Sequence, residues 1–351
     1  MAKKEVPEGI LRSIMMLDAE GKKSLLGELK VLIARDMAGQ GTEGDRPSCP
    51  RCGCTWVVKK GKTKKGKQRW LCRGCGRTFG ETTDSIIGLS KLPIETWMRY
   101  AEGMAERRTL RELQEMCHVS LKTSWYMRMR ICEAMGRHLD AFVSGPGVNV
   151  EVDGTVLHES LKGNNGKGSF VMPRDAHESG DSLHVRGVSG QLVNVVFAAD
   201  DRGGLVARVM GRAHGSAALI RDCLADIPGP GTRVATDGLA AYETVLEELG
   251  CEHEVRPSKP KAGERSLGMV NAAHKRFDDW MRRFNGVSTR RLGRYLSWHM
   301  WETQFRSTDA GWAELTTREA MTGTYEARVS TIFNEPRFSM SYWEERGWQV
   351  A

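Results

Sequence analysis

Four cysteines in two CxxC pairs have the clearest chemical spacing in this sequence. Cys49 and Cys52 form the first pair, and Cys72 and Cys75 form the second after nineteen intervening residues. Each pair places two thiolates on one side of a tight turn, and two such turns can close a tetrahedron around Zn²⁺. Since four protein ligands leave no open position, we expect structural zinc that orders a segment with few apolar residues. Four unrelated thiols are the alternative, and Cys54 is a substitute ligand, although the regular spacing favours Cys52.

Acidic residues on two expected strands form a second candidate site. Asp153 lies in VEVDGT, where apolar residues alternate, so Glu151 shares its strand face as a spare ligand or a neighbour of the site. Asp237 ends TRVATDG, where the chain turns into a helix. Such carboxylates suit Mg²⁺, and two ions bridged by one Asp can flank a phosphodiester. Taken alone, each Asp is better explained as a turn or capping residue, as are Asp200 and Asp201 before a Gly pair.

Basic charge is concentrated in the cysteine segment. Eleven of the 52 Lys and Arg residues lie between Arg46 and Gly80, a stretch without Asp or Glu, and 41 basic and 44 acidic residues remain elsewhere. Such a run is usually a solvated face, but phosphate backbones also select it. We expect the hairpin between the cysteine pairs to contact DNA while Trp56 and Trp70 pack beneath it; a merely soluble hairpin is the alternative. The residues expected to contact DNA are Lys59, Lys60, Lys62, Lys64, Lys65, Lys67 and Arg69.

Length and composition limit the class of protein. A chain of 351 residues suggests two or three domains, and 40% hydrophobic with 27% charged residues is typical of globular proteins, which excludes disorder, collagen and coiled coil. No stretch approaches the roughly 18 apolar residues of a membrane span, and the start MAKKEVPEGILRS lacks the apolar core of a signal peptide. We therefore expect a cytoplasmic protein with no membrane partner, whose thiols are reduced.

The order of the expected elements predicts a multidomain α/β protein. Residues 1–45 are expected to form a helical segment and linker, and residues 46–82 a zinc ribbon. Three helices are expected within residues 90–142. Residues 147–306 begin with three strands and continue with alternating helix and strand, which predicts a mixed sheet with flanking helices. Residues 307–351 carry no interpretable motif and form an unassigned C-terminal extension.

The helical region has the pattern of a helix-turn-helix. A short helix from Leu110 to Met116 is followed by a turn at His118, and Ser120 is a natural N-cap for the next helix. In this motif the second helix enters the major groove of DNA. A plain three-helix packing unit fits the pattern equally well, but the adjoining basic segment favours DNA binding. The positions expected to face DNA are Lys122, Thr123, Ser124 and Tyr126, with Trp125 and Met129 facing the core.

Taken together, these segments resemble the zinc-ribbon DDE transposases of bacterial insertion sequences, the ISXO-type group or fifteen-ninety-five family. The resemblance runs from about Cys49 to Arg306 and is carried by CPRC to CRGCGRTF, KTSWYMRMRICEAM, VEVDGT, TDGLAAY and the run from VNAAHKRF to WETQFR. It implies a ribonuclease-H-like mixed sheet, with the family's first two catalytic acids at Asp153 and Asp237.

The third catalytic position departs from the family pattern. The pattern N-x-x-E reads NAAH at residues 271–274, so His274 stands where many relatives carry Glu. A neutral imidazole can bind a divalent metal, but the site loses one negative charge, which is expected to shift its preference toward Mn²⁺. The alternative is that His274 lies on a helix surface beside an inactive site. Glu264 and Glu302, which lie outside the motif, are candidate substitutes for the third catalytic residue. A second departure is Gly154, where relatives often carry Glu.

The resemblance implies a DNA transposase, an enzyme of the polynucleotidyl transferase class that binds element ends and catalyses metal-dependent strand cleavage and strand transfer. Asp153, Asp237 and His274 would hold two Mg²⁺ or Mn²⁺ ions, beside the structural Zn²⁺. The implied partners are double-stranded DNA and further copies of the chain in a synaptic complex, in the cytoplasm of a bacterium at the nucleoid. Two alternatives remain: an inactive, transposase-derived sequence-specific DNA-binding protein or repressor, and a nuclease or resolvase that never joins strands.

Basic residues around His274 are a further candidate DNA contact. They are expected to grip the strand that is cut or joined, and solvated helix faces are the alternative. These residues are Lys275, Arg276, Arg282, Arg283, Arg290, Arg291 and Arg294.

Overall fold

The computed structural model forms two compact units, which are treated separately below. One unit contains the cysteine segment and helices from both ends of the chain, and the other contains a five-stranded sheet with its helices. None of the described helices combines the length and the apolar character needed to cross a membrane. The described residues are 8–18, 21–22, 25, 29, 47–63, 66, 68–80, 83, 86–88, 90–142, 144–160, 162, 192–212, 216–257, 261, 265–305 and 311–322.

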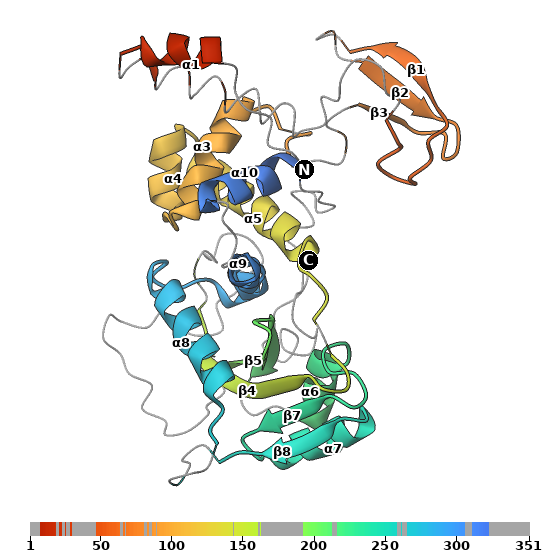
Figure 1. Ribbon diagram of the computed structural model, residues 1–351, viewed down its shortest axis with the longest axis vertical. Helices are drawn as coiled ribbons and strands as arrows, with labels where there is room; N and C mark the ends of the chain where they lie inside the picture. The colour runs from red at the N-terminus through yellow and green to blue at the C-terminus, as the bar shows by residue number, and fades with distance from the viewer. Residues whose placement is uncertain are drawn as a thin grey trace, which may run out of the picture. The chain divides into compact units, whose positions relative to one another are not determined.

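The cysteine segment folds into a three-stranded antiparallel sheet, shown in orange in Figure 1. Its strands are β1 (Val57–Lys62), β2 (Gln68–Cys72) and β3 (Thr78–Gly80), in the order β1-β2-β3. The buried core comprises only Cys49, Val57, Cys72 and Phe79. So small a core contributes little burial energy, which agrees with the expectation that a metal orders the segment.

Helices from distant parts of the chain complete the first unit. α1 (Glu8–Met15) lies in the helical segment expected within residues 1–45. α3 (Ile94–Ala105) packs against α10 (Trp312–Thr322), which belongs to the extension that was left unassigned. The pattern of α10 is too short to identify from sequence, because the helix depends on a partner more than 200 residues away.

The expected helix boundaries around His118 are confirmed. α4 (Leu110–Cys117) ends at His118, which has a positive φ of 53°, and α5 (Leu121–Arg137) starts after Ser120. The Ser120 hydroxyl accepts a hydrogen bond from the Thr123 N–H at 3.1 Å, as predicted for an N-cap. Within the second unit α5 packs against α9 (Leu292–Gln304), so this helix belongs by its contacts to the unit that contains the sheet.

The mixed sheet predicted from the alternating pattern is confirmed. Its strands are β4 (Asn149–His158), β5 (Leu192–Asp200), β6 (Leu205–Arg212), β7 (Arg233–Thr236) and β8 (Glu252–Val255). They lie in the order β6-β5-β4-β7-β8, with β4 at the centre. β4, β5 and β6 are antiparallel, whereas β7 runs parallel to β4 and β8 runs parallel to β7. The centre of the sheet is therefore where strands of both orientations meet.

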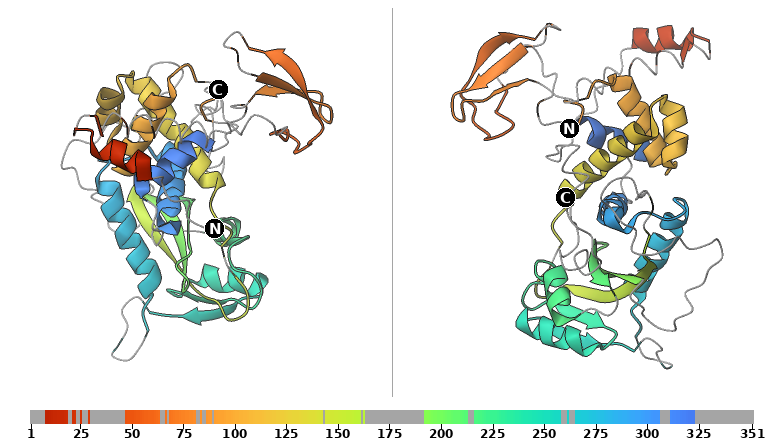
Figure 2. Two further views of the ribbon diagram at one scale, coloured as in Figure 1. Left: turned by 45° about the horizontal axis from the view of Figure 1, so that its top comes forward. Right: turned by 180° about the vertical axis from the view of Figure 1, so that it is seen from behind.

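Helices cover both faces of this sheet, as Figures 1 and 2 show. On one face α6 (Ala217–Leu224) and α7 (Ala240–Glu248) contribute to a core that includes Val150 and Val152 of β4. α8 (Gly268–Arg282) packs against β4 and β5, and α9 packs against β6. Because strand side chains alternate, the residues of β4 that flank Val152 point toward the α8 side.

The turn between β5 and β6 has the chemistry expected for Asp200 and Asp201. The Asp200 carboxylate accepts hydrogen bonds from the N–H groups of Arg202 at 2.9 Å and Gly204 at 2.7 Å. Asp201 accepts from the Asn149 side chain at 2.7 Å. The prediction of turn residues is confirmed.

Candidate functional site

The four cysteines converge as the spacing predicted. Their sulfur atoms all lie within 4.8 Å of one another, with Sγ separations of 3.7 Å for Cys49 and Cys75 and 3.6 Å for Cys52 and Cys72. Tetrahedral zinc with Zn–S bonds of about 2.3 Å requires sulfur atoms roughly 3.8 Å apart, so the residues fit the metal. Cys54 lies outside this group, with its sulfur 4.0 Å from the Trp56 carbonyl oxygen, so Cys52 and not Cys54 is the residue that the structure places in the cluster.

Glycines shape both cysteine turns. Gly53 and Gly76 directly follow the second cysteine of each pair and adopt φ values of 70° and 69°. Their N–H groups donate to the carbonyls of Cys49 and Cys72 at 2.9 Å and 3.0 Å. Only glycine adopts this left-handed conformation without strain, so C-x-x-C-G is the local signal for the turn. The Cys75 N–H donates to the Cys72 sulfur and lowers the pKa of that thiol. The Cys54 N–H lowers the pKa of the Cys52 thiol, but the side-chain hydrogen bond with Cys72 opposes this effect and the pKa of Cys52 is raised overall.

The basic hairpin is partly as expected. Lys59, Lys60, Lys62 and Arg69 are exposed, while Lys64, Lys65 and Lys67 lie outside the described residues. Trp70 packs against the small ribbon core, but Trp56 is 68% exposed, so the prediction that both aromatics pack beneath the hairpin is wrong for Trp56. The reason is strand alternation: Val57 points into the core, so its neighbour points outward.

One of the four positions predicted to face DNA on α5 is buried. Ser124 is fully buried and its hydroxyl donates to the Leu110 carbonyl at 2.9 Å, so the prediction that it is exposed is wrong. Position 124 lies one turn after the Ser120 cap, on the face of α5 that packs inward. Lys122 is exposed and Thr123 is half-buried. Tyr126 is also half-buried, with the Arg130 guanidinium 4.4 Å from its ring centroid, and Trp125 is only half-buried although it was expected in the core.

Asp153 lies on β4, and Asp237 directly follows β7, the strand that runs parallel beside β4. Glu151 of β4 pairs with Ala235 of β7, so extending this register by two residues places Asp153 beside Asp237. Asp153 is half-buried and Asp237 is exposed. Burial raises the pKa of Asp153 to about 6, although the Gly154 N–H donates to its carboxylate, and the Asp237 charge raises the pKa further. The sequence prediction that strands bring these two acids together is therefore supported by register and by electrostatics.

His274 on α8 reaches the same part of the sheet. Its ring lies edge-on to Phe197, with centroids 4.8 Å apart, and Phe197 pairs with Asp153 across β4 and β5. Burial lowers the pKa of His274 to about 4, while a hydrogen bond to the Asp153 backbone opposes this shift. Nε2 is buried, and none of the described groups bonds to it. His274 therefore presents a neutral imidazole, with one unsatisfied nitrogen, close to Asp153.

This donor set fits a divalent cation. Two carboxylates and a neutral imidazole are suitable ligands, and a cation would satisfy the buried Nε2 and relieve the repulsion between Asp153 and Asp237. Unlike the cysteines, these three side chains are not among the described groups whose ligand atoms all lie within 4.8 Å of one another.

The other candidate acids already accept hydrogen bonds from the protein or lie outside the described residues. Glu302 is buried and accepts hydrogen bonds from Arg107 at 2.9 Å and from the Trp280 indole at 2.9 Å. Both oxygens of Glu151 are also engaged, by Arg256 and by the start of α8. Glu264 lies outside the described residues. Of the candidates for the third position, His274 is the described residue that packs against Phe197, the cross-strand neighbour of Asp153.

The basic residues near His274 divide into exposed and buried groups. Lys275 is exposed, and Arg282 is exposed while pairing with Asp279 at 3.0 Å. Arg291 and Arg294 are buried, and Arg294 pairs with Glu133 at 3.3 Å, so the prediction that these two arginines grip DNA is wrong. Arg294 instead links α9 to Glu133 of α5, and the Arg291 guanidinium lies 5.3 Å from the centroid of the Trp125 ring.

Phe197 and Arg256 contribute to the site but were missed from the sequence. Phe197 lies in a continuous apolar run, where nothing distinguishes it from core residues. Arg256 directly follows β8, a strand with the residues EHEV that lacks an apolar alternation. The strand register, which becomes known only with the sheet, is the information that would have identified both.

We expect Asp153→Asn to stabilise the protein at pH 8. The folded-state pKa of about 6 exceeds the unfolded value near 3.8, so stability falls as pH rises between these values and stays reduced above pH 6. Removal of the charge should recover about 1–2 kcal/mol at pH 8, after allowance for solvent screening, and little at pH 4. Urea unfolding at both pH values, with no divalent metal except the structural zinc, measures the difference. A difference that does not change with pH would contradict the assigned cost of burying the charged Asp153 carboxylate.

The described residues thus define a protein with a zinc-ribbon cysteine cluster and an α/β unit that carries a candidate cation site. Residues 47–76 match the InsA N-terminal domain, a zinc ribbon. The uncharacterized protein in transposable element ISH50 of Halobacterium salinarum is 26% identical over 255 residues, which cover 71% of this chain and 82% of the relative. The uncharacterized 48.3 kDa protein of insertion element ISM1 from Methanobrevibacter smithii is 32% identical over 72 residues, 17% of this chain and 18% of the relative.

Among solved structures, the Mos1 transposase paired-end complex with left transposon end matches 75% of this chain and 82% of its own, at 12% identity and a TM-score of 0.26. The chain therefore carries an InsA-type zinc ribbon and is similar to proteins of insertion elements.

Proposed function

We propose that this protein is a DNA transposase of an insertion sequence, which binds the element ends and catalyses metal-dependent strand cleavage and strand transfer. The observation that carries the proposal is the placement of Asp153 on the central strand β4, with Asp237 directly after the neighbouring strand β7. His274, whose buried Nε2 lacks a hydrogen-bond partner among the described groups, packs against Phe197, the cross-strand neighbour of Asp153. The sheet, with helices on both faces, agrees with the ribonuclease-H-like domain that the sequence resemblance implies. The InsA-type ribbon and the relatives from insertion elements support the same function.

Each of the three side chains has a role set by its surroundings. Asp153, on the central strand, would hold the divalent ions together with Asp237 and His274. Neutral His274 can use Nε2 as a ligand at any pH well above its pKa of about 4. When bound, such ions lower the pKa of water and stabilise the leaving oxygen of a phosphodiester.

The proposed reaction has two balanced steps. In the first, the oxygen of water bonds to the phosphorus at the element end as the bond to O3′ breaks, which leaves a 3′-hydroxyl and releases a proton to solvent. In the second, this hydroxyl bonds to a phosphorus of the target DNA, whose own O3′ leaves with the proton. Neither step needs a covalent enzyme intermediate. Because two ends must be joined to one target, the active assembly contains more than one copy of the chain.

A cleavage and joining assay tests this function. Duplexes from the natural inverted repeats, with and without a pre-cut 3′ end, are incubated with the protein and Mg²⁺ or Mn²⁺. We expect nicking at the element end and joining of pre-cut ends to a plasmid, with Mn²⁺ more effective than Mg²⁺ because one ligand is an imidazole. Cleavage without joining would favour a nuclease or resolvase, and end binding without either reaction would overturn the enzyme assignment.

Binding of the ribbon to DNA predicts a change in salt dependence. Replacing the exposed Lys59, Lys60 and Lys62 with Gln should remove up to three phosphate contacts. The slope of log K against log salt should then decrease in magnitude by about 2–3, with weaker binding to all sequences alike. Fluorescence anisotropy at several salt concentrations measures this slope. An unchanged slope would show that these lysines form only a solvated face.

An inactive DNA-binding protein is the second candidate, favoured by one observation. His274 removes a negative charge from the position at which the family pattern has Glu. Such a protein would keep the ribbon and α5 as binding elements and act by occupying element ends.

A further inference from the structure

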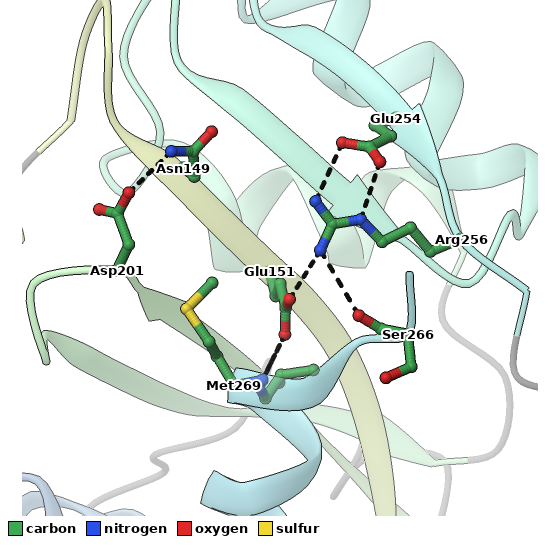
Figure 3. A network of polar contacts seen from close by, with 8 residues as sticks. Asn149, Glu151, Asp201, Glu254, Arg256, Ser266 and Met269 are labelled. Atoms are coloured by element: carbon green, nitrogen blue, oxygen red, sulfur yellow. Dashed lines mark hydrogen bonds and ion pairs between the residues drawn. The ribbon is translucent and has the colours of Figure 1, made fainter. Parts of the chain in front are cut away.

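Glu151 lies at the centre of a polar network that contacts the three segments of the candidate site: β4, the end of β7 and the start of α8. Its side chain is buried, with 4% exposure, and points from β4 toward the start of α8 (Figure 3). One carboxylate oxygen accepts from the Arg256 guanidinium at 2.7 Å. The other accepts from the backbone N–H groups of Met269 at 2.6 Å and Val270 at 3.1 Å. Both oxygens are therefore engaged, which leaves Glu151 poorly suited to be a spare metal ligand.

The carboxylate supplies a cap that α8 lacks locally. The residue before the helix is Leu267, which offers no side-chain cap, and no acidic residue lies in the first turn. The free N–H groups of a first turn need acceptors and favour negative charge. Glu151 meets both needs from a strand more than a hundred residues earlier in the chain, and so determines where α8 begins relative to β4.

The position of the start of α8 determines where the His274 ring lies. Val270 precedes His274 by four residues, so the two side chains lie on the same face of α8. Val270 is fully buried, as are Ala273 and Phe277 of the same face. A shift of the helix start along or away from β4 would move the His274 ring relative to Asp153, because a helix moves as a rigid element over so short a distance.

Arg256 ties the same network to the end of β7. Its guanidinium pairs with Glu254 through two bonds of 2.9 Å and 3.0 Å and lies 3.5 Å from the Ser266 carbonyl before α8 (Figure 3). Its backbone N–H donates to the Thr236 carbonyl at 2.8 Å, next to Asp237. The arginine also compensates the buried charge of Glu151, which would otherwise be costly.

We propose that Glu151 and Arg256 are positioning residues that hold α8 so that the His274 imidazole faces Asp153. The inference deepens the proposed function, because it rests on the assignment of His274 as a metal ligand. The two residues act through the start of a helix and contact neither the metal nor DNA.

Histidine NMR on the full chain, labelled with ¹⁵N-histidine, tests this role. Spectra are recorded for wild type, Glu151→Ala, Glu151→Gln and the control Asn149→Ala, with the His274 signals assigned from His274→Ala. Asn149 lies on the same strand as Glu151, and Asn149→Ala removes its hydrogen bond to Asp201; no dashed line in Figure 3 joins this pair to the contacts of Glu151 and Arg256. We expect Glu151→Ala to shift and broaden the His274 signals, and the control to leave them unchanged.

Titration with Mn²⁺ gives a second readout. In wild type the His274 signals should broaden at low Mn²⁺ concentration, and Glu151→Ala should require about 10–100-fold more metal. Glu151→Gln should recover much of this loss, because its amide oxygen can still accept from Met269 and Val270. Circular dichroism checks that each variant is folded, and Arg256→Met replaces Glu151→Ala should the latter not fold.

The outcomes separate the two claims. If Glu151→Ala is less stable but keeps the wild-type His274 signals and Mn²⁺ response, the positioning role is overturned. If the His274 signals move in Glu151→Ala but do not respond to Mn²⁺ in wild type, the positioning role holds and the proposed metal function fails.

Discussion

Cys72→Ser is expected to release the zinc and unfold residues 47–80 while leaving the sheet-containing unit folded. The ribbon core consists of Cys49, Val57, Cys72 and Phe79, too few side chains to offset the entropy lost on ordering some thirty residues. Structural zinc contributes apparent free energies of about 10–16 kcal/mol in small zinc domains, so its loss decides whether the segment folds. Zinc content should fall from about one ion per chain to none, and trypsin should cut rapidly in the basic hairpin.

Cys54→Ser is the matched control for this prediction. Cys54 lies two residues after Cys52 but outside the group of sulfur atoms within 4.8 Å of one another. The variant should therefore retain zinc, resist trypsin and bind DNA as wild type does. Equal zinc loss in both variants would show that the ligand set has been assigned wrongly.

Asp237→Asn is expected to abolish strand cleavage and joining while DNA binding is retained. Asp237 is exposed directly after β7, and the one hydrogen bond of its carboxylate among the described residues comes from the Leu239 N–H at 3.2 Å, so its replacement should not disturb the fold. Loss of one anionic ligand should reduce the cleavage rate by on the order of 10³-fold or more, equivalent to about 4 kcal/mol of transition-state stabilisation. Single-turnover cleavage with Mn²⁺ and a parallel gel-shift assay measure the two properties. Cleavage that persists in the variant would place the chemistry elsewhere.

A substitution at His274 tests the same site by adding a negative charge, whereas Asp237→Asn removes one. His274→Glu restores the negative charge of the family pattern and should shift the metal preference from Mn²⁺ toward Mg²⁺. His274→Ala should reduce cleavage with either metal. Wild-type activity in His274→Ala would assign His274 to the packing of α8 alone.

Local patterns predicted much of the fold correctly. The cysteine turns depend only on neighbouring residues, and the Ser120 cap and the β4, β5 and β6 strands follow from short-range periodicity. Asp153 could be assigned to a strand face because its neighbours alternate, and Asp237 to a strand end because a helix follows. In each case the information lies within about ten residues of the feature.

Features that depend on distant partners could not be predicted. β8 has the sequence EHEV and joins the sheet through parallel pairing with β7, while α10 depends on α3. Ser124 is buried because of the Leu110 carbonyl, which is a tertiary contact. The ion pair of Glu151 and Arg256 spans 105 residues, and no local pattern links its two members.

The most direct test of the central claim is the anomalous diffraction of Mn²⁺ in crystals of the protein. The account predicts manganese peaks about 2.0–2.2 Å from the Asp153 and Asp237 carboxylates and from His274 Nε2, and their absence in Asp237→Asn crystals. Crystals that contain Mn²⁺ at saturating concentration but show no peak between these three side chains would contradict it.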